Sequence, residues 1–208
     1  MDKELYIIRH GETDLNKQGI IQGRGIDSDL NDTGRAQAAG FYNLYKDIPF
    51  DKVYTSALKR TQQTVQGFID AGLTWEKQAG LDELAWGEWE GKQTNEKVIG
   101  AFKDITEKWQ GGDYDAHFKG GESPNDVAIR LKEVIELIKS RPEEKLILVC
   151  MHGRALRLLM CLMSNMPMSA MYDFPHQNTG LYKVSLSGDT FTITETNNTD
   201  HLKVVPTI

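Results

Sequence analysis

The sequence predicts an α/β fold, a three-layer sandwich in which a mostly parallel central sheet carries helices on both faces. Short apolar runs at Leu5–Ile8, Lys52–Thr55 and Lys145–Met151 are typical of buried strands. Helical patterns separate these runs along the chain, and strands that alternate with helices favour parallel pairing with both faces covered. With 208 residues, the chain is long enough to bury a full core.

The first half of the chain gives two helix starts after strands. Asp32 or Thr33 can cap a helix that runs through the alanine-rich stretch Arg35–Tyr45. After the strand at 52–55, Ser56 is placed to cap a second helix from about Ala57 to Ile69. Both helices therefore connect strands, as a parallel sheet requires.

The second half continues the alternation and ends in a hairpin. Ser123 precedes Pro124, the pattern of an N-cap followed by proline in the first helical turn. Two segments that alternate at period two flank Ser-Gly-Asp, which predicts a hairpin. The remaining expected elements are a strand at 75–77, a weak helix at 94–110, a helix at 154–163 and a turn or short helix at 167–172.

Composition sets limits on the class of protein. The net charge of −6 argues against broad binding to nucleic acid or to a membrane surface, but it permits an anionic small substrate. The longest apolar runs are far shorter than the roughly 20 residues that span a bilayer. Cys150 and Cys161 lie in apolar segments and are expected to be core thiols in a reducing compartment. We expect one domain over residues 1–208, a cytoplasmic location and a homodimer as an option.

Two strand ends present the same pattern, a histidine followed by glycine. His10-Gly11 follows the first strand, and His152-Gly153 follows the strand at 145–151. Ligands bind at the carboxyl ends of strands in open α/β sheets. If the two strands are neighbours, the two histidines meet at one site although they are far apart in the chain.

Two arginines indicate what such a site would bind. Arg9 precedes His10, and Arg60 lies one turn into the helix after the second strand. Guanidinium groups bind phosphate oxygens in bidentate fashion, and a neutral histidine can act as a nucleophile or as an acid or base. Two arginines and two histidines therefore suit a phosphoryl group. No Walker A pattern or acidic metal cage is visible, so we expect neither a metal nor a cofactor.

At these residues the sequence resembles the histidine phosphatase superfamily, the clan of cofactor-dependent phosphoglycerate mutase, fructose-2,6-bisphosphatase and the α-ribazole phosphatases. The resemblance covers nearly the whole chain and rests on an ordered set of motifs. These are Leu5–Thr13 with Asn16, Gln22-Gly23 through Asp27, Leu30 to Gly34 with Gln37 and Ala38, Ser56 to Thr64, Leu81 to Gly91, Gly121-Glu122-Ser123 and His152-Gly153. It implies a phosphoglycerate mutase-like fold.

The resemblance also implies roles for individual residues. It makes His10 the nucleophile that becomes phosphohistidine, and Glu83 the group that protonates the leaving group and then activates water. It assigns binding of the phosphoryl oxygens to Arg9, Arg60 and His152, with Asn16, Gln22, Gly23 and Gly153 as further substrate-binding residues. Three other acids near Glu83 are competitors for the proton-donor role: Asp82, Glu88 and Glu90.

Departures from the family pattern separate the possible activities. The mutases carry Glu-Arg-His-Tyr-Gly after the proton donor, whereas this chain reads Glu-Leu-Ala-Trp-Gly at 83–87. The chain is therefore expected to be a phosphatase that hydrolyses small phosphorylated metabolites. A mutase, and an inactive protein that binds phosphorylated ligands, are the alternatives. Leu15, Asp29 and Met151 stand where tryptophan, proline and serine are common, and only Met151 removes a hydroxyl near the site.

Weaker features lie around the expected site. Residues 92–121 are expected to form a lid over it. Trp86 and Trp89 can line a substrate pocket or anchor the packing, and both options stay open. The three remaining histidines lack partners at metal-ligand spacing and are expected to be structural or exposed: His117, His176 and His201.

Overall fold

The computed structural model describes residues 2–204, and these residues form a six-stranded sheet in the order β3-β2-β4-β1-β5-β6. Strands β1 to β4 run parallel to one another, and β5 and β6 add an antiparallel hairpin at one edge. The strands are β1 Asp2–Arg9, β2 Lys52–Thr55, β3 Trp75–Lys77, β4 Leu146–Met151, β5 Leu181–Ser187 and β6 Thr190–Asn198. The expected mostly parallel sheet is confirmed.

The register of the central strands brings the predicted site residues to one edge. Cys150 of β4 pairs with Ile8 of β1 on one side and with Thr55 of β2 on the other. The residues that directly follow these strand positions therefore lie next to one another at the carboxyl ends. His10 continues this alignment because its N–H donates to the carbonyl of Met151 at 3.0 Å.

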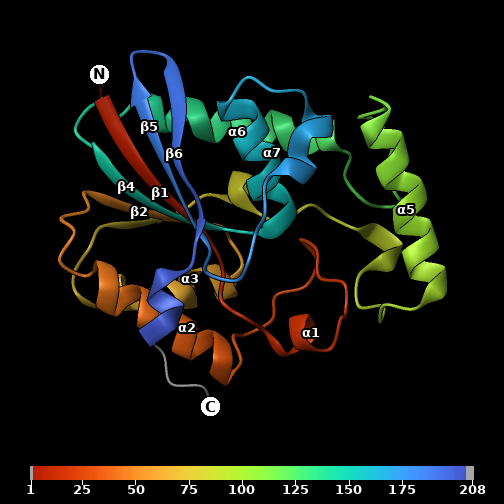
Figure 1. Cartoon of the computed structure of the whole chain (residues 1–208), viewed down its shortest axis with the longest axis horizontal. Helices are drawn as coiled ribbons and strands as arrows, with labels where there is room; N and C mark the ends of the chain where they lie inside the picture. Colours follow the sequence, from red (N-terminus) through yellow and green to blue (C-terminus); the bar gives the residue numbers. More distant parts are fainter. Residues whose placement is uncertain (1, 205–208) are drawn as a thin grey trace.

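Helices cover both faces of the sheet (Figure 1). One face packs under the helices after β1 and β2, and its core contains Phe41, Phe50 and Phe68. The other packs under α6 and α7 around Leu131 and Leu156. The helices are α1 Asp14–Lys17, α2 Asp32–Tyr45, α3 Lys59–Thr64, α4 Gln66–Asp70, α5 Glu96–Gln110, α6 Pro124–Lys139 and α7 Gly153–Met163, with 3₁₀ turns η1 Ala79–Leu81, η2 Gly87–Trp89, η3 Met168–Asp173 and η4 Asp200–Val204.

Two helix starts differ from the sequence-based expectation. Asn31, rather than Asp32 or Thr33, caps α2 by accepting a hydrogen bond from the N–H of Gly34. The helix expected over 57–69 is two short helices that meet at Val65, and Ser56 caps neither of them. The Ser56 hydroxyl contacts a histidine instead, as described below. The sequence places Ser56 beside the nearest helix and does not show a partner that is distant along the chain.

Later elements agree with the expectation. Ser123 and Asp126 form a capping box at the start of α6, with Pro124 in its first turn. Gly188 adopts a positive φ of 61° in the turn of the β5–β6 hairpin, where glycine is favoured. Cys150 and Cys161 are buried and free, as expected for core thiols. Within residues 2–204, none of the helices has the length and apolar character needed to cross a bilayer.

Candidate active site

His10 lies at the carboxyl end of β1, buried and close to His152. The two imidazole rings have centroids 5.1 Å apart. The Nδ1 atom of His10 lies 2.7 Å from the carbonyl oxygen of Gly11, which can only accept, so Nδ1 carries the proton and Nε2 keeps its lone pair. Burial, followed by the charges of Arg60 and Arg9, holds the pKa of His10 well below 6.5. The ring is therefore a neutral imidazole with a free nucleophilic nitrogen.

His152 follows β4 and is held by the hydroxyl of Ser56. Its Nε2 lies 2.8 Å from Ser56 Oγ, which also accepts from the N–H of Leu58. The Thr61 hydroxyl donates to the Leu58 carbonyl, so the Ser56 proton points to Thr61 and His152 donates through Nε2. The other nitrogen, Nδ1, is buried and has no partner among the described residues.

Two guanidinium groups approach the same place. Arg9 donates from Nη1 to the carbonyl of His176 at 2.9 Å, and Arg60 donates from Nη1 to the carbonyl of Ile26 at 2.6 Å. The Nε atoms of both arginines are buried and lack an acceptor within residues 2–204. Burial also lowers the pKa of both groups. Each cation is thus fixed by a carbonyl and keeps an unused donor.

Glu83 is buried and sits against the first turn of α7. Its Oε1 accepts from the N–H groups of Leu84 and Ala155, both at 3.0 Å, and its Oε2 accepts from the N–H of Arg154 at 3.1 Å. Arg130 fixes the backbone at this point by donating to the Glu83 carbonyl at 3.1 Å. The surroundings of this carboxyl group are therefore not only apolar. Backbone N–H groups donate to both of its oxygens, and two of these donors belong to the N-terminus of α7.

The competing acids occupy other positions. Asp82 accepts from the N–H of Ala57 and pairs with Arg24 at 3.0 Å, so both of its oxygens are engaged in the scaffold. Glu90 accepts from the N–H of Trp86 at 3.0 Å. Glu88 is exposed. None of these three contacts α7 in the way that Glu83 does.

The other predicted binding residues fall into two groups. Gly153 joins the site as the first residue of α7, and a Cβ there would meet the His176 ring at 2.9 Å and Arg9 Nε at 3.5 Å. Gly23 is buried, and its carbonyl lies 3.5 Å from Arg60 Nη2. Asn16 and Gln22 both hydrogen-bond Thr13, and among the described residues neither side chain hydrogen-bonds His10 or His152.

The structure adds contacts that the sequence did not reveal. Asn178 donates to the carbonyl of His10 at 2.9 Å, and Thr64 accepts from the N–H of Gly11 at 2.9 Å. His176, which we expected to be structural or exposed, packs beside Gly153 and Arg9. Burial and the charges of neighbouring arginines lower its pKa to about 3. These contacts join segments far apart in the chain, and no local pattern could have indicated them.

An aromatic cluster connects the site to α5. Trp86 packs against Phe102 and Trp109 of α5 and against Phe118, with ring centroids 4.8 to 6.3 Å apart. Trp89 contacts Phe102 and Phe118 as well. Both tryptophans therefore anchor packing. Trp86 also lies 5.6 Å from the guanidinium carbon of Arg154, so it borders the site as well.

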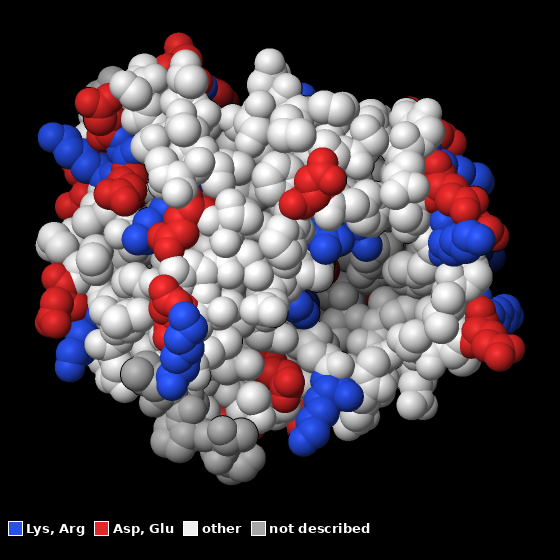
Figure 2. Space-filling model, viewed as in Figure 1, with Lys and Arg blue, Asp and Glu red and all other residues white. Residues whose placement is uncertain are grey.

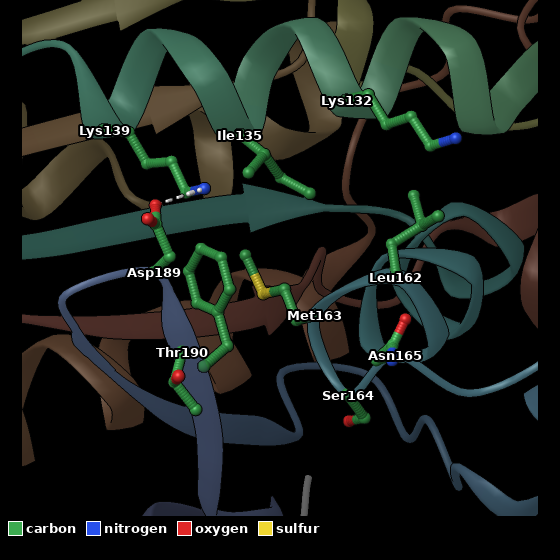
Figure 3. Close-up of a pocket in the computed structure, with 10 residues that line it drawn as sticks. Lys132, Ile135, Lys139, Leu162, Met163, Ser164, Asn165, Asp189 and Thr190 are labelled. Carbon is green, nitrogen blue, oxygen red and sulfur yellow. Dashed lines mark hydrogen bonds and ion pairs between the residues drawn. The ribbon is translucent and has the colours of Figure 1, made fainter.

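The protein has two hollows that differ in the side chains around them. Figure 2 shows one between the centre of the molecule and α5, with basic side chains at its border. A second cavity, of about 510 Å³, lies at the far end of α7 between α6 and the β5–β6 hairpin, where Lys139 pairs with Asp189 at 3.1 Å (Figure 3). Among the described residues that line this second cavity, none is a histidine or a cysteine. In the part of the chain that the structure describes, no cluster of three metal-ligating side chains occurs.

Comparison with known proteins agrees with this geometry. The family model of the histidine phosphatase superfamily (branch 1) matches residues 5–199. The chain belongs to the histidine phosphatase superfamily. The expected fold and the expected class of enzyme, a phosphoric monoester hydrolase, are thereby confirmed.

Individual members of the superfamily resemble the chain over most of its length. Phosphoserine phosphatase 1 of Hydrogenobacter thermophilus is 27% identical over 96% of this chain and 94% of its own. A 2,3-bisphosphoglycerate-dependent phosphoglycerate mutase of Azorhizobium caulinodans is 29% identical over 80% of this chain and 84% of its own. The structure of Bacillus stearothermophilus YhfR superposes with a TM-score of 0.83 at 27% identity and covers 96% of this chain and 99% of its own.

Proposed function

We propose that this histidine phosphatase hydrolyses small phosphate monoesters through a phosphohistidine on His10. The observation that carries the proposal is a set of three buried nitrogen atoms without acceptors or donors of their own. They are Arg9 Nε, Arg60 Nε and His152 Nδ1. Unpartnered buried polar atoms are rare in proteins. An oxyanion bound beside His10 would accept from both arginines, and also from His152 once its Nδ1 is protonated.

The first step transfers the phosphoryl group to the enzyme. His10 Nε2 attacks phosphorus, a P–N bond forms, and the P–O bond to the leaving group breaks. Glu83, in its protonated form, gives its proton to the departing alkoxide. Arg9 and Arg60 neutralise charge on the phosphoryl oxygens. His152 joins them as a donor when it takes up a proton at Nδ1 with the bound anion.

The second step releases phosphate. A water molecule attacks phosphorus while the Glu83 carboxylate takes its proton, and the P–N bond breaks. Inorganic phosphate leaves, and His10 returns to its neutral form. Since Glu83 is reprotonated by this step, the enzyme is ready for the next substrate without any other proton source.

Trapping the intermediate tests this assignment. Wild-type enzyme quenched in alkali during turnover of ³²P-labelled substrate should retain label that is stable to base and released by acid. His10→Ala should retain none, whereas His117→Asn, which alters an exposed histidine, should label like the wild type. Label on another residue, or normal turnover by His10→Ala, would refute the proposal. Transfer of the label to a second hydroxyl compound rather than to water would make the enzyme a mutase.

Further properties belong to the same proposal. We propose a metal-independent enzyme of the cytoplasm, with a homodimer as its candidate assembly and residues 92–121 as the lid. The arginines supply the charge that a metal would otherwise provide, and the two free cysteines suit a reducing compartment. Activity should persist in EDTA. Light scattering on the purified protein gives its mass, and a monomer would remove the dimer from the proposal.

A further inference from the structure

The turn before β5, residues 176–180, holds the end of β1 in place. The carbonyl of the first residue of this turn accepts from Arg9 Nη1 at 2.9 Å, and the N–H of Thr179 donates to the Arg9 carbonyl at 3.0 Å. The side chain of Asn178 donates to the carbonyl of His10 at 2.9 Å. Three hydrogen bonds from one turn therefore fix the two residues at which the proposed chemistry begins.

Thr179 has a backbone conformation that is unusual for its side chain. Its φ is positive, 55°, in the left-handed region where a residue branched at Cβ is strained. The N–H of Gly180 donates to the Gln177 carbonyl at 3.0 Å, which makes Thr179 the third residue of a four-residue turn. Glycine or asparagine is usual where this position has positive φ. The other non-glycine residues with positive φ in the described chain are indeed asparagines, Asn165 and Asn197. Thr179 therefore needs contacts from outside the turn to keep its conformation.

His201 supplies such a contact from the last described segment of the chain. Its ring is buried, and its Nε2 lies 2.8 Å from Thr179 Oγ1. The Thr179 hydroxyl gives its own proton to the Asn178 carbonyl at 2.7 Å, so it accepts from His201, and Nε2 carries the proton. The Nδ1 atom has no partner among the described residues. Within residues 2–204, the hydrogen bond to Thr179 is thus the only one that the His201 ring makes.

Packing fixes the His201 ring itself. It contacts Phe41 and Tyr45 of α2 edge-on, with ring centroids 5.2 and 6.3 Å apart, and η4 lies beside α2 (Figure 1). Asn197 adds a second contact from the same segment, since its Oδ1 accepts from the N–H of Gln177 at 2.9 Å. The last described part of the chain therefore braces the turn before β5 from the side away from β1.

We propose that His201 is a positioning residue, which holds Thr179 in its strained conformation and thereby fixes the end of β1 for phosphoryl transfer. This inference rests on the proposed function and deepens it, because it names a residue outside the group that binds the phosphoryl oxygens. Without the hydrogen bond from His201, relaxation of Thr179 toward negative φ would displace the donors to Arg9 and His10. A displacement of about 1 Å between reacting groups can slow a reaction by about 100-fold.

Two substitutions at His201 separate the hydrogen bond from the packing. His201→Phe keeps a ring against α2 but removes the donor, and it should slow phosphorylation of His10 by about 10- to 100-fold. His201→Gln keeps an N–H donor near the position of Nε2, so it should restore most of the rate although it packs less well. Rapid alkaline quench with saturating ³²P-labelled substrate gives the rate constant and the labelled fraction. A lower labelled fraction with an unchanged rate constant in both variants would show a purely structural role and overturn the proposal.

Substitutions at Thr179 test the other end of the same hydrogen bond and leave the packing on α2 intact. Thr179→Ser keeps the hydroxyl and should phosphorylate at close to the wild-type rate. Thr179→Val removes the hydroxyl and keeps the branch at Cβ, so it should be as slow as His201→Phe. The double variant should be no slower than the slower single variant, because both changes remove one contact. Losses that multiply would show independent effects and overturn the proposal. These variants also decide the question if His201→Phe does not fold.

Asn165 provides a matched control for backbone strain. It is exposed after the far end of α7, and its φ is also positive, 53°. Asn165→Thr places the same branched side chain in the same backbone region, so it should lower the stability of the protein and leave the rate constant of phosphorylation unchanged. Slowing equal to that of Thr179→Val would assign the effect to strain anywhere in the fold, against the proposal.

The outcomes separate the positioning role from the proposed function. A wild type that labels His10, with His201→Phe and Thr179→Val labelling at the same rate, would overturn the positioning role and leave the phosphatase intact. Absence of a phosphohistidine on His10 in the wild type would refute the proposed function itself.

Discussion

At the amino ends of β2, β3 and β4, the protein surrounds its cations with acids. Arg141 pairs with Glu76 at 2.6 Å and with Glu144 at 3.4 Å, and Lys52 pairs with Glu76 at 3.1 Å. The Tyr54 hydroxyl donates to Glu144 at 2.5 Å. Hydrogen bonds from Arg141 are the largest influence on Glu76 and lower its pKa to about 2. Every cation in this network has an acidic partner from the chain itself.

The carboxyl ends of the same sheet are arranged in the opposite way. Arg9, Arg60, Arg154 and Arg157 form no ion pair with any described carboxylate, and Glu83 is held by backbone N–H groups. Unpaired buried charge destabilises a fold. The protein therefore neutralises its cations with acids at one end of the sheet, and at the other end it leaves the cations of the proposed site without an acidic partner among the described residues.

The largest expected effect comes from removing a cation at the carboxyl ends. Arg60→Gln should lower kcat/KM for an alkyl phosphate by about 10³- to 10⁵-fold, the range for an arginine that stabilises phosphoryl transfer. Arg141→Gln is the matched change at the amino ends. It should keep activity per folded molecule and lower the free energy of unfolding by about 2 kcal/mol. Comparable losses of activity in Arg60→Gln and Arg141→Gln would contradict the difference proposed between the carboxyl and amino ends of the sheet.

The next effect concerns Glu83 and the leaving group. Glu83→Gln keeps the acceptor oxygen but has no acidic proton, so it should slow hydrolysis of an alkyl phosphate by about 10²- to 10⁴-fold. It should slow hydrolysis of p-nitrophenyl phosphate much less, because nitrophenolate leaves without a proton. The measurement is the rate of hydrolysis of both substrates by the wild type and by Glu83→Gln. Equal slowing would remove Glu83 from this role, and the same dependence in Asp82→Asn, Glu88→Gln or Glu90→Gln would transfer it.

Inorganic phosphate should supply the anion that the free site lacks. At about 100 times its dissociation constant, phosphate should stabilise the wild type by about 2.7 kcal/mol, because it binds only the folded state. Thermal melts with and without phosphate measure the effect. Arg9→Gln should respond far less at the same concentration, whereas Arg141→Gln should respond like the wild type. A full response in Arg9→Gln would show that phosphate binds elsewhere.

The last prediction concerns how the stability of the protein depends on pH. Burial lowers the pKa of four histidines, to about 4 for His201 and about 3 for His176, and well below 6.5 for His10 and His152. The unfolded chain protonates them near 6.5, so stability is full above that pH and falls below it. The slope should approach about 1.4 kcal/mol per pH unit for each histidine.

Urea unfolding at several pH values between 7.5 and 4 measures this slope. His201→Asn removes one of the four groups; His201 bonds Thr179 at 2.8 Å and packs against Phe41 of α2, with ring centroids 5.2 Å apart. The slope of stability against pH for this variant should be shallower by up to about 1.4 kcal/mol per pH unit, which corresponds to one proton. Stability that stays constant from pH 7 to 5 would show that the histidines take up protons in the folded protein as they do in the unfolded chain.

Local sequence patterns were sufficient for most of the fold and for the centre of the site. Strand and helix periodicity depends on residues close in the chain, so β1, β4 and α6 followed from sequence. His10 and His152 could be joined because both follow strands that a parallel sheet brings together. The family motifs supplied the roles proposed for Arg60 and Glu83.

The remaining features depend on contacts between distant segments. Ser56 was assigned to a helix cap, yet it holds His152, 96 residues away. Asn178 reaches the carbonyl of His10 from the loop before an antiparallel strand. Arg154 looks like an ordinary helix charge in the sequence, and only the folded chain shows that it lacks an acidic partner. Such distinctions require the three-dimensional arrangement.

The way Glu83 is held also bears on how this enzyme can change over evolutionary time. Two of its three donors are backbone N–H groups of Arg154 and Ala155, and these groups exist whatever side chain stands at position 154. A mutation at position 154 can therefore replace the side chain while both backbone donors to Glu83 remain. The placement of the proposed proton donor does not depend on that side chain, so descendants of this chain can vary residue 154 without displacing Glu83.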